Sequence, residues 1–311
     1  TAVTLVPAMA ESAAHVTMLQ RSPTYVVSRP AEDATANWLR AKLPAKLAYG
    51  LVRWRNVLFQ MFFFNLARKR PEKTKERLIE MVRGELGADY DVATHFTPRY
   101  NPWDQRLCLV PDADLFAVIK SGKASVVTDT IAHFTHDGIA LQSGAELPAD
   151  VVVTATGLEL QLLSDVTFSV DGAPVDLSKT FNYKGMMFSD VPNMATSFGY
   201  TNASWTLKAD LTCAYVCRLL NTMKKRGLRQ ATPRVGDAAL TPAPFLDFSS
   251  GYVTRAMEKF PKQGSKTPWR VHQNYARDLL ALRYGSVDDG MEFSNPATPE
   301  ATRAAQSRIT A

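Results

Sequence analysis

The sequence has few cysteines and no long hydrophobic run. Its 311 residues include only Cys108, Cys213 and Cys217, with no Cys-x-x-Cys pair, which favours a reducing intracellular compartment over a disulfide framework. No apolar run reaches the roughly 20 residues that a membrane-spanning helix needs. The five histidines have no cysteine or carboxylate partners at zinc-ligand spacing, so we predict no metal site.

Basic residues are in excess but are not gathered into a tract. The net charge is +6, with 46% hydrophobic and 21% charged residues, an ordinary composition for a globular protein with room for two domains. This balance suits phosphate-bearing ligands or an anionic membrane surface, and it gives no reason to predict nucleic acid as a partner.

The first twenty residues predict a helix followed by a strand. Leu5, Val6 and Met9 lie on one helical face, and the alternating run HVTMLQ then predicts a strand over 15–20. A helix, a short link and a strand ending in Arg21 match the second half of a βαβ nucleotide-binding unit. A basic residue at this strand end accommodates the 2′-phosphate of NADP, although a solvated arginine explains the same pattern.

Residues 31–100 break the α/β pattern and predict a helical insertion, with interruptions at Pro44, Gly50 and Pro71. Its middle part, over 51–64, carries an apolar stripe between basic ends. We favour a helical subdomain that packs on a sheet and roofs a pocket. The alternative is a helix that lies on a membrane surface.

From residue 124 the pattern becomes β. We predict a strand, a hairpin turning at 136–138, a second turn at Ser143–Gly144, and a buried parallel strand at 151–153. The last strand runs into Ala-Thr-Gly, where Gly157 allows a tight backbone turn over a cofactor.

A helix is predicted after residue 202, with Asn202 or Ser204 as N-cap and Gly227 as its stop. Its N-terminus would present free N–H groups to an electron-rich ligand edge, such as a flavin ring, although a capped structural helix explains the same residues. Cys213 and Cys217 are expected in its core. The predicted buried positions share one helical face: Leu207, Leu211, Tyr215, Leu219 and Met223.

Five ordered segments together resemble class B flavoprotein monooxygenases, the family of Baeyer–Villiger and flavin-containing monooxygenases. They are VTMLQRSPTY, YNPWDQRLCLVPDADLF, ELPADVVVTATGL, YKGMMFSDVPNMATSFGYTNASWTLKADL and PKQGSKTPWRVHQNYARDL. The resemblance implies an α/β, two-dinucleotide-binding-domain flavoprotein with a Rossmann-like fold. It also implies a fragment, because the family's glycine-rich FAD and NADPH turns and its FxGxxxHxxxWP fingerprint are not in this sequence.

The resemblance also implies a division of the chain. Its expected parts are the remainder of an NADP-binding Rossmann unit (1–30), the helical insertion (31–100), the rest of the NADP domain with a β-meander (101–157), the C-terminal part of the FAD domain (158–227), and a substrate-side extension and tail (228–311).

On the NADP side, the resemblance assigns residues at the chain start and after the first strand. Arg21 with Ser22 would read the 2′-phosphate, and Thr1 and Ala2 would be what remains of the pyrophosphate-binding turn. Gln105 stands where many relatives have a lysine that also binds the 2′-phosphate, which weakens the expected selectivity for NADP over NAD.

On the flavin side, Arg106 corresponds to the family's catalytic arginine, whose guanidinium would stabilise the anions formed when oxygen reacts at the flavin. The other flavin-side positions are Thr156, Gly157, Asn202, Ser204 and Trp205. Trp269 and Arg270 would line or cap the substrate pocket, or serve in packing.

The implied function is an FAD-dependent, NADPH-consuming monooxygenase that inserts one oxygen of O₂ into a ketone or oxidises a sulfur or nitrogen centre. The alternatives are an N/S-oxygenating enzyme without Baeyer–Villiger activity and a non-catalytic membrane-surface fragment. We expect a small-molecule substrate, a cytoplasmic protein with peripheral membrane contact, and no activity from this chain alone.

Overall fold

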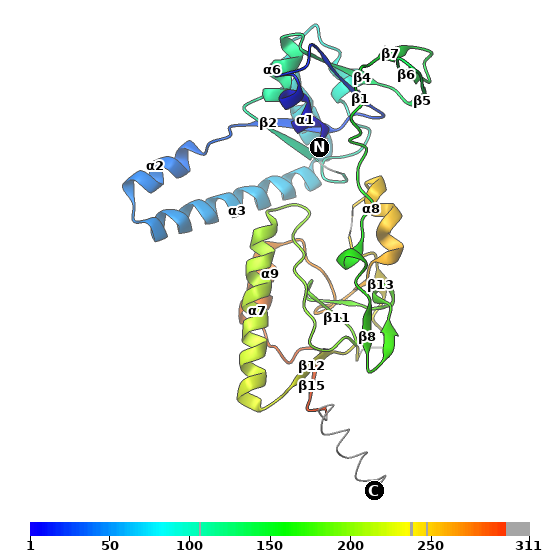
Figure 1. Cartoon of the computed structure of the whole chain (residues 1–311). Helices are drawn as coiled ribbons and strands as arrows, with labels where there is room; N and C mark the ends of the chain where they lie inside the picture. Colours follow the sequence, from blue (N-terminus) through cyan, green and yellow to red (C-terminus); the bar gives the residue numbers. More distant parts are fainter. Residues whose placement is uncertain (106, 237–238, 247, 297–311) are drawn as a thin grey trace. The chain divides into compact units, whose positions relative to one another are not determined.

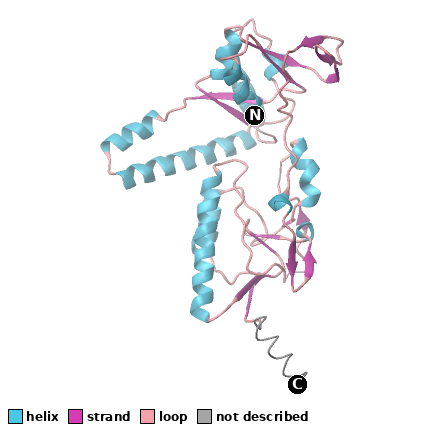
Figure 2. Cartoon of the chain, in the orientation of Figure 1, coloured by secondary structure: helices cyan, strands magenta, loops and turns pink. Residues whose placement is uncertain are grey.

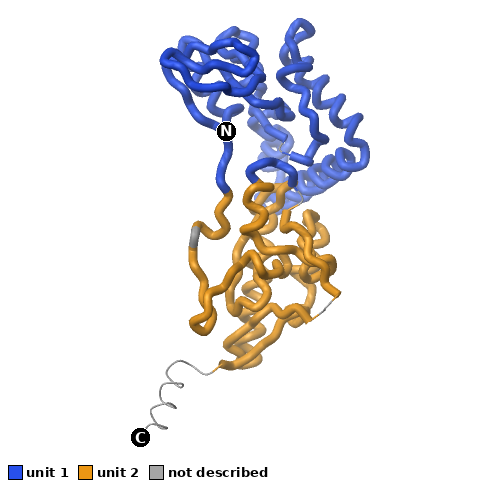
Figure 3. The backbone as a smooth tube through the Cα atoms, turned by 90° about the vertical axis from the view of Figure 1, so that its right-hand side faces the viewer, with its two compact units in different colours: residues 1–159, 248–252 blue, residues 160–247, 253–311 orange. Residues whose placement is uncertain are grey.

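The computed structural model describes residues 1–105, 107–236, 239–246 and 248–296. The chain forms two compact units, residues 1–159 with 248–252 and residues 160–247 with 253–311 (Figure 3). Both units mix helices and strands (Figure 2).

Unit 1 begins with the predicted helix and strand, which are confirmed. Two parallel strand pairs, β1 with β4 and β2 with β3, carry helices α1 and α6 (Figure 1). Val6 of α1, Met18 of β1 and Phe116 of α6 share one buried cluster, so apolar burial fixes these helices against the strands. The bounds are α1 (Ala2–Met9), β1 (Val16–Gln20), β2 (Tyr25–Arg29), β3 (Leu107–Pro111), α6 (Asp114–Lys120) and β4 (Ala124–Thr128).

Residues 31–100 are largely helical, as predicted. Asp33 caps α2 by accepting from the Ala36 N–H at 3.0 Å, and Pro71 occupies the first turn of α4, where its missing N–H costs nothing. The predicted break at Gly50 is wrong: Gly50 lies inside α3, because a single glycine only weakens a helix. The bounds are α2 (Ala34–Lys42), α3 (Ala45–Lys69), α4 (Pro71–Leu86) and α5 (Val92–Phe96).

The predicted meander forms a three-stranded antiparallel sheet, β5 (Ile131–Phe134), β6 (Gly138–Leu141) and β7 (Glu146–Pro148). The buried strand predicted at 151–153 is wrong. Val151 is 76% exposed, and residues 149–161 form no strand. Three β-branched residues favour a strand only where a neighbouring strand exists to pair with them, and the described residues supply none there.

Unit 2 is built from short antiparallel strand pairs and one long helix, α7. The pairs are β8 with β9, β10 with β11, β12 with β15 and β13 with β14. The bounds are β8 (Phe168–Val170), β9 (Ala173–Val175), β10 (Asn182–Tyr183), β11 (Met187–Phe188), α7 (Trp205–Arg226), β12 (Gln230–Pro233), β13 (Pro242–Ala243), β14 (Gln263–Gly264), α9 (Tyr275–Leu279) and β15 (Met291–Ser294). Helix α8 (Gly251–Ala256) starts in residues assigned to unit 1 and ends in residues assigned to unit 2. Single turns of 3₁₀ or π helix occur at 162–165, 177–179, 257–259 and 280–284.

Helix α7 has the predicted ends and the predicted buried face. Ser204 is its N-cap, and Gly227 ends it in the left-handed conformation at φ 66°, which glycine adopts without penalty. All five predicted core positions are buried. The expectation for Cys213 and Cys217 is wrong, because both are exposed: helical spacing places them away from the Leu211–Tyr215 face.

Candidate functional site

The first group of site residues lies at the carboxyl end of β1. Because α1 leads directly into β1 and packs on it, the N-terminus of α1 and the end of β1 belong to the same edge. Thr1 and Ala2 begin α1, whose first turn holds no acidic residue, and Arg21 and Ser22 follow β1, both exposed. Within the described part of the chain, Arg21 makes no hydrogen bond or ion pair.

Polar side chains that the sequence analysis missed fix this edge. The Gln20 amide donates to the His95 carbonyl at 2.7 Å and to the Thr128 hydroxyl at 2.9 Å, and His95 Nδ1 lies 2.8 Å from the same hydroxyl. Gln20 and Thr128 end the paired strands β1 and β4. Polar residues at the ends of two adjacent parallel strands were the available signal. The free guanidinium of Arg21 thus follows a rigid strand end.

The segment before β3 carries Gln105, which is half-buried and bridges to Pro102. Trp103 contacts Phe63 and Phe64 of α3 edge to face, with ring centroids 5.5 Å and 5.8 Å apart. These contacts attach the segment to the helical insertion. Arg106, the predicted catalytic residue, lies outside the described residues.

Thr156 and Gly157 are exposed and belong to no strand. Gly157 has φ 107°, and a Cβ built on it would meet nothing within 4 Å. The glycine is therefore required by its backbone conformation and leaves open space above the chain.

The N-terminus of α7 has no side-chain cap hydrogen bond. Ser204 is its N-cap, yet the Ser204 hydroxyl pairs with Thr206 Oγ1 at 2.8 Å and does not accept from a helix N–H. The first turn contains no acid, so its positive dipole end has no partner from its own side chains. This arrangement fits an electron-rich ligand edge.

Asn202 and Trp205 have structural contacts in this region. The Asn202 amide donates to the Gln273 carbonyl at 3.0 Å, which leaves its oxygen and its second N–H for a ligand. The Trp205 ring packs against Phe198 with centroids 5.0 Å apart, and it covers Gly199, where a Cβ would lie 2.1 Å from its Cγ. Neither side chain is free to reorient without breaking these contacts.

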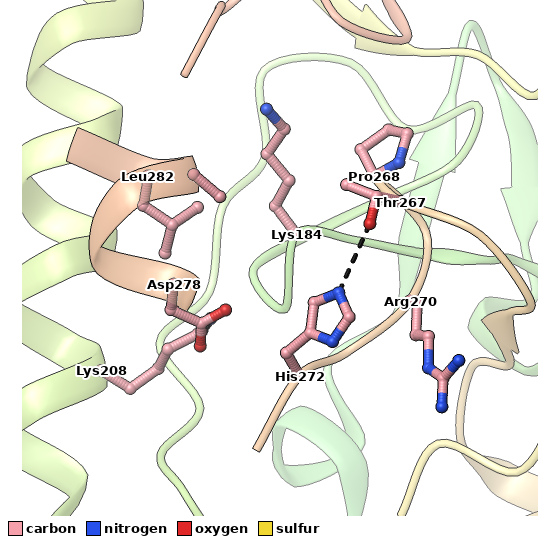
Figure 4. Close-up of a pocket in the computed structure, with 9 residues that line it drawn as sticks. Lys184, Lys208, Thr267, Pro268, Arg270, His272, Asp278 and Leu282 are labelled. Atoms are coloured by element: carbon pink, nitrogen blue, oxygen red, sulfur yellow. Dashed lines mark hydrogen bonds and ion pairs between the residues drawn. The ribbon is translucent and has the colours of Figure 1, made fainter. Parts of the chain in front are cut away.

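A buried charge cluster in unit 2 was also missed. Lys208 of α7 and Asp278 of α9 pair at 2.8 Å with side chains 3% and 7% exposed, and Tyr200 donates to the same carboxylate oxygen at 2.7 Å. Figure 4 shows Lys208 and Asp278 approaching from the two helices. Lys208 adjoins Leu207 on the buried face of α7, and a lysine on an apolar helical face was the available signal.

Burial sets the pKa directions here. It lowers the pKa of Lys208, which the nearby Asp278 opposes, and raises the pKa of Tyr200. Burial also lowers the pKa of His272, which lines the adjoining small pocket with Lys184 and Arg270. Trp269 is buried and packs on Phe181 and Tyr183.

The described residues contain neither a membrane-spanning helix nor a group of metal ligands. No helix among them combines the length and the hydrophobicity that a membrane crossing needs. No three histidines, cysteines or carboxylates in the described ranges form a group that could hold a metal ion.

The chain is similar to curated monooxygenases over nearly its whole length. It is 52% identical over 301 residues to the FAD-containing monooxygenase EthA of Mycobacterium tuberculosis, covering 96% of this chain and 62% of the relative. It is 47% identical over 311 residues to the probable FAD-binding monooxygenase AlmA of Acinetobacter baylyi, covering 99% and 62%. No family model matches. The chain thus spans about three-fifths of the length of these relatives.

Solved structures have the same fold. The chain matches steroid monooxygenase bound to NADP with a TM-score of 0.65 at 16% identity, covering 94% of this chain and 65% of that one. It matches OTEMO in complex with FAD and NADP with a TM-score of 0.61 at 15% identity, covering 94% and 64%. The predicted fold class is confirmed: the chain has the α/β fold of the two-dinucleotide-binding-domain flavoproteins.

Proposed function

We propose, from its relationship to FAD-containing monooxygenases, that this chain is part of an FAD-dependent, NADPH-consuming monooxygenase. The observation that carries the proposal is 52% identity over 301 residues to such a protein. The matched solved structures with NADP bound support the coenzyme.

The residues present fit part of each cofactor. For NADPH, the N-terminus of α1 would face the pyrophosphate and the unpaired Arg21 would bind the 2′-phosphate by charge-assisted hydrogen bonds. For FAD, the N-terminus of α7, which has no side-chain cap, would face the ring. In unit 1, the backbone at Gly157 leaves open space for a cofactor. No Gly-x-Gly-x-x-Gly occurs in the sequence, so the chain provides no glycine-rich turn for the FAD pyrophosphate.

Bound FAD, reduced by NADPH, would supply the oxygen chemistry with O₂. The chain's own contribution is positional and electrostatic. The Gln20–His95–Thr128 hydrogen bonds hold the strand end that precedes Arg21. Arg106 would place a fixed positive charge where negative charge develops on oxygen.

We further propose that the substrate is a small molecule with a ketone, thioether or amine centre, and that ketones undergo Baeyer–Villiger insertion. The test uses the complete protein that contains this chain. Arg106→Ala should reduce ester formed per NADPH consumed by about a hundredfold or more while bound FAD persists. Arg106→Lys should restore little, because an ammonium lacks the planar guanidinium fork. Near-normal coupling in the alanine variant refutes the Baeyer–Villiger proposal. Oxidation of a thioether with no ester from any ketone would support the N/S-oxygenating alternative.

The 311-residue chain alone should neither hold FAD nor oxidise NADPH, because it has no turn for the FAD pyrophosphate. The measurement is the visible flavin spectrum and NADPH-dependent oxygen uptake of the purified chain. A stoichiometric flavin spectrum with oxygen uptake contradicts this expectation.

We also propose that the protein is cytoplasmic with a peripheral membrane contact, which helix α3 supports. Five large apolar residues repeat at helical spacing on it and are 45–67% exposed, and basic residues stand near both ends of the helix. The five are Leu47, Leu51, Trp54, Leu58 and Phe62. Such a face binds the interfacial region of anionic bilayers.

Liposome co-sedimentation tests the contact. Leu58→Gln with Phe62→Gln should abolish binding to anionic vesicles, whereas Gln60→Ala with Asn65→Ala on the same helix should leave it unchanged. Equal binding by both pairs, or no binding by the unsubstituted chain, refutes the contact.

A further inference from the structure

One carboxylate oxygen joins two parts of the chain that flank the start of α7. Asp278 Oδ2 accepts from the Tyr200 hydroxyl at 2.7 Å and from the Lys208 ammonium at 2.8 Å. All three residues are at most 5% exposed. Hydrogen bonds to a charged group at such depth are among the stronger ones in proteins.

Tyr200 and Lys208 stand on either side of residues 201–207, which hold the loop before α7 and its first turn. The segment just before α9 adds two contacts to that loop through one residue. The Thr201 N–H donates to Gln273 Oε1 at 3.0 Å, and the Asn202 amide donates to the Gln273 carbonyl at 3.0 Å. Residues 201–207 are thus fixed at both ends by Asp278 and within the loop by Gln273.

The surrounding backbone makes room for the Lys208 ammonium. A Cβ at Gly185 would lie 3.0 Å from Lys208 Cε and 3.1 Å from its Nζ, and Gly185 has φ 78°. A buried ion pair adds little net stability over apolar side chains of the same volume. The Lys208–Asp278 pair is therefore better explained by the conformation of residues 201–207 that it holds than by the stability it adds.

We propose that Asp278 is a positioning residue that sets the conformation of residues 201–207 through Tyr200 and Lys208. The proposal rests on the proposed function, because the segment it positions is the one that would face the flavin ring.

The first test needs no cofactor. Backbone hydrogen exchange is measured on the 311-residue chain carrying Tyr200→Phe or Asp278→Asn. Tyr200→Phe loses one hydrogen bond to the carboxylate, and Asp278→Asn removes the charge from both contacts, so exchange within 201–207 should become at least about tenfold faster. Asp288→Asn is the matched control, because Asp288 pairs with Arg226 at the other end of the same helix. Unchanged exchange at 201–207 in Tyr200→Phe overturns the proposal.

The second test separates positioning from simple stabilisation in the complete protein that contains this chain. Lys208→Met with Asp278→Leu removes the pair without leaving a buried charge, so the thermal midpoint should recover relative to Asp278→Asn. Tyr200 has no acceptor in this double variant. The FAD dissociation constant of the double variant should therefore be about tenfold higher than that of the unsubstituted protein, with a shifted flavin absorption band.

Recovery of both the midpoint and FAD binding in the double variant overturns the positioning role. If the unsubstituted complete protein binds no FAD, the proposed function fails. The exchange measurement on the chain then still decides whether Asp278 orders residues 201–207.

Discussion

Gly199→Ala should displace the Trp205 ring from the start of α7. The new Cβ would lie 2.1 Å from Trp205 Cγ and 2.5 Å from both Cδ atoms. These atoms are near the root of the indole, so a small shift of its far edge gives no relief and the ring must rotate about χ1. The rotation breaks the contact with Phe198, whose ring centroid is 5.0 Å away.

The cost follows from the area that the ring now buries. Trp205 is 54% exposed, so of about 250 Å² for a tryptophan it hides roughly 110 Å², worth up to about 3 kcal/mol. We expect Gly199→Ala to lower the free energy of unfolding by about 1–3 kcal/mol. Urea unfolding followed by far-ultraviolet circular dichroism measures it without relying on tryptophan fluorescence.

A double-variant cycle tests the stated cause. With Trp205→Ala already present, the clash is gone and Gly199→Ala should cost at least about 1 kcal/mol less. Gly236→Ala is the control, because a Cβ there meets nothing within 4 Å, and it should change stability by about 0.5 kcal/mol or less. Additive effects of the two substitutions would refute the clash as the cause.

Three further predictions address the coenzyme, the pH dependence and the helical insertion. In the complete protein, Arg21→Ala should raise the KM for NADPH about ten- to a hundredfold more than the KM for NADH; equal changes contradict the assignment. The folded-state pKa of His272 is lowered by burial. As the pH falls, His272 is therefore protonated at a higher pH in the unfolded chain than in the folded chain, and stability should fall below about pH 6.5. His272→Gln should flatten that slope in unfolding experiments at pH 5 and 7, and an unchanged slope assigns it to other groups. Gly50→Ala, inside α3 with open space at its Cβ, should stabilise unit 1 by about 0.5–1 kcal/mol in urea unfolding, unlike a break-forming glycine.

The sequence predicted best where local chemistry decides the structure. The ends of α7 at Ser204 and Gly227, and the turn before Gly138, depend on residues that act within a few positions of themselves. Gly50 does not break α3, because one glycine only weakens a helix and α3 packs against α2 and α4. Ala67, for example, is fully buried in the same helix.

The site was predicted only in part, since its connections are long-range. The motif residues Arg21 and Asn202 could be located from the sequence, but not the Gln273 carbonyl that holds Asn202. Asp278 is seventy residues from Lys208 along the chain, and no local pattern pairs them. A charged residue on a buried helical face indicates that it has a partner of opposite charge, but it does not identify that partner.

The exposed valines at 151–153 determine how this chain should behave at high concentration. Val151, Val152 and Val153 are 76%, 44% and 50% exposed, and the run Val-Val-Val-Thr-Ala-Thr contains no charge and no proline. An unpaired segment of this kind offers a full row of backbone N–H and C=O groups to another chain. Purified 311-residue chains should therefore self-associate through this segment by cross-strand pairing, with rising thioflavin fluorescence, and Val152→Lys should keep them in solution.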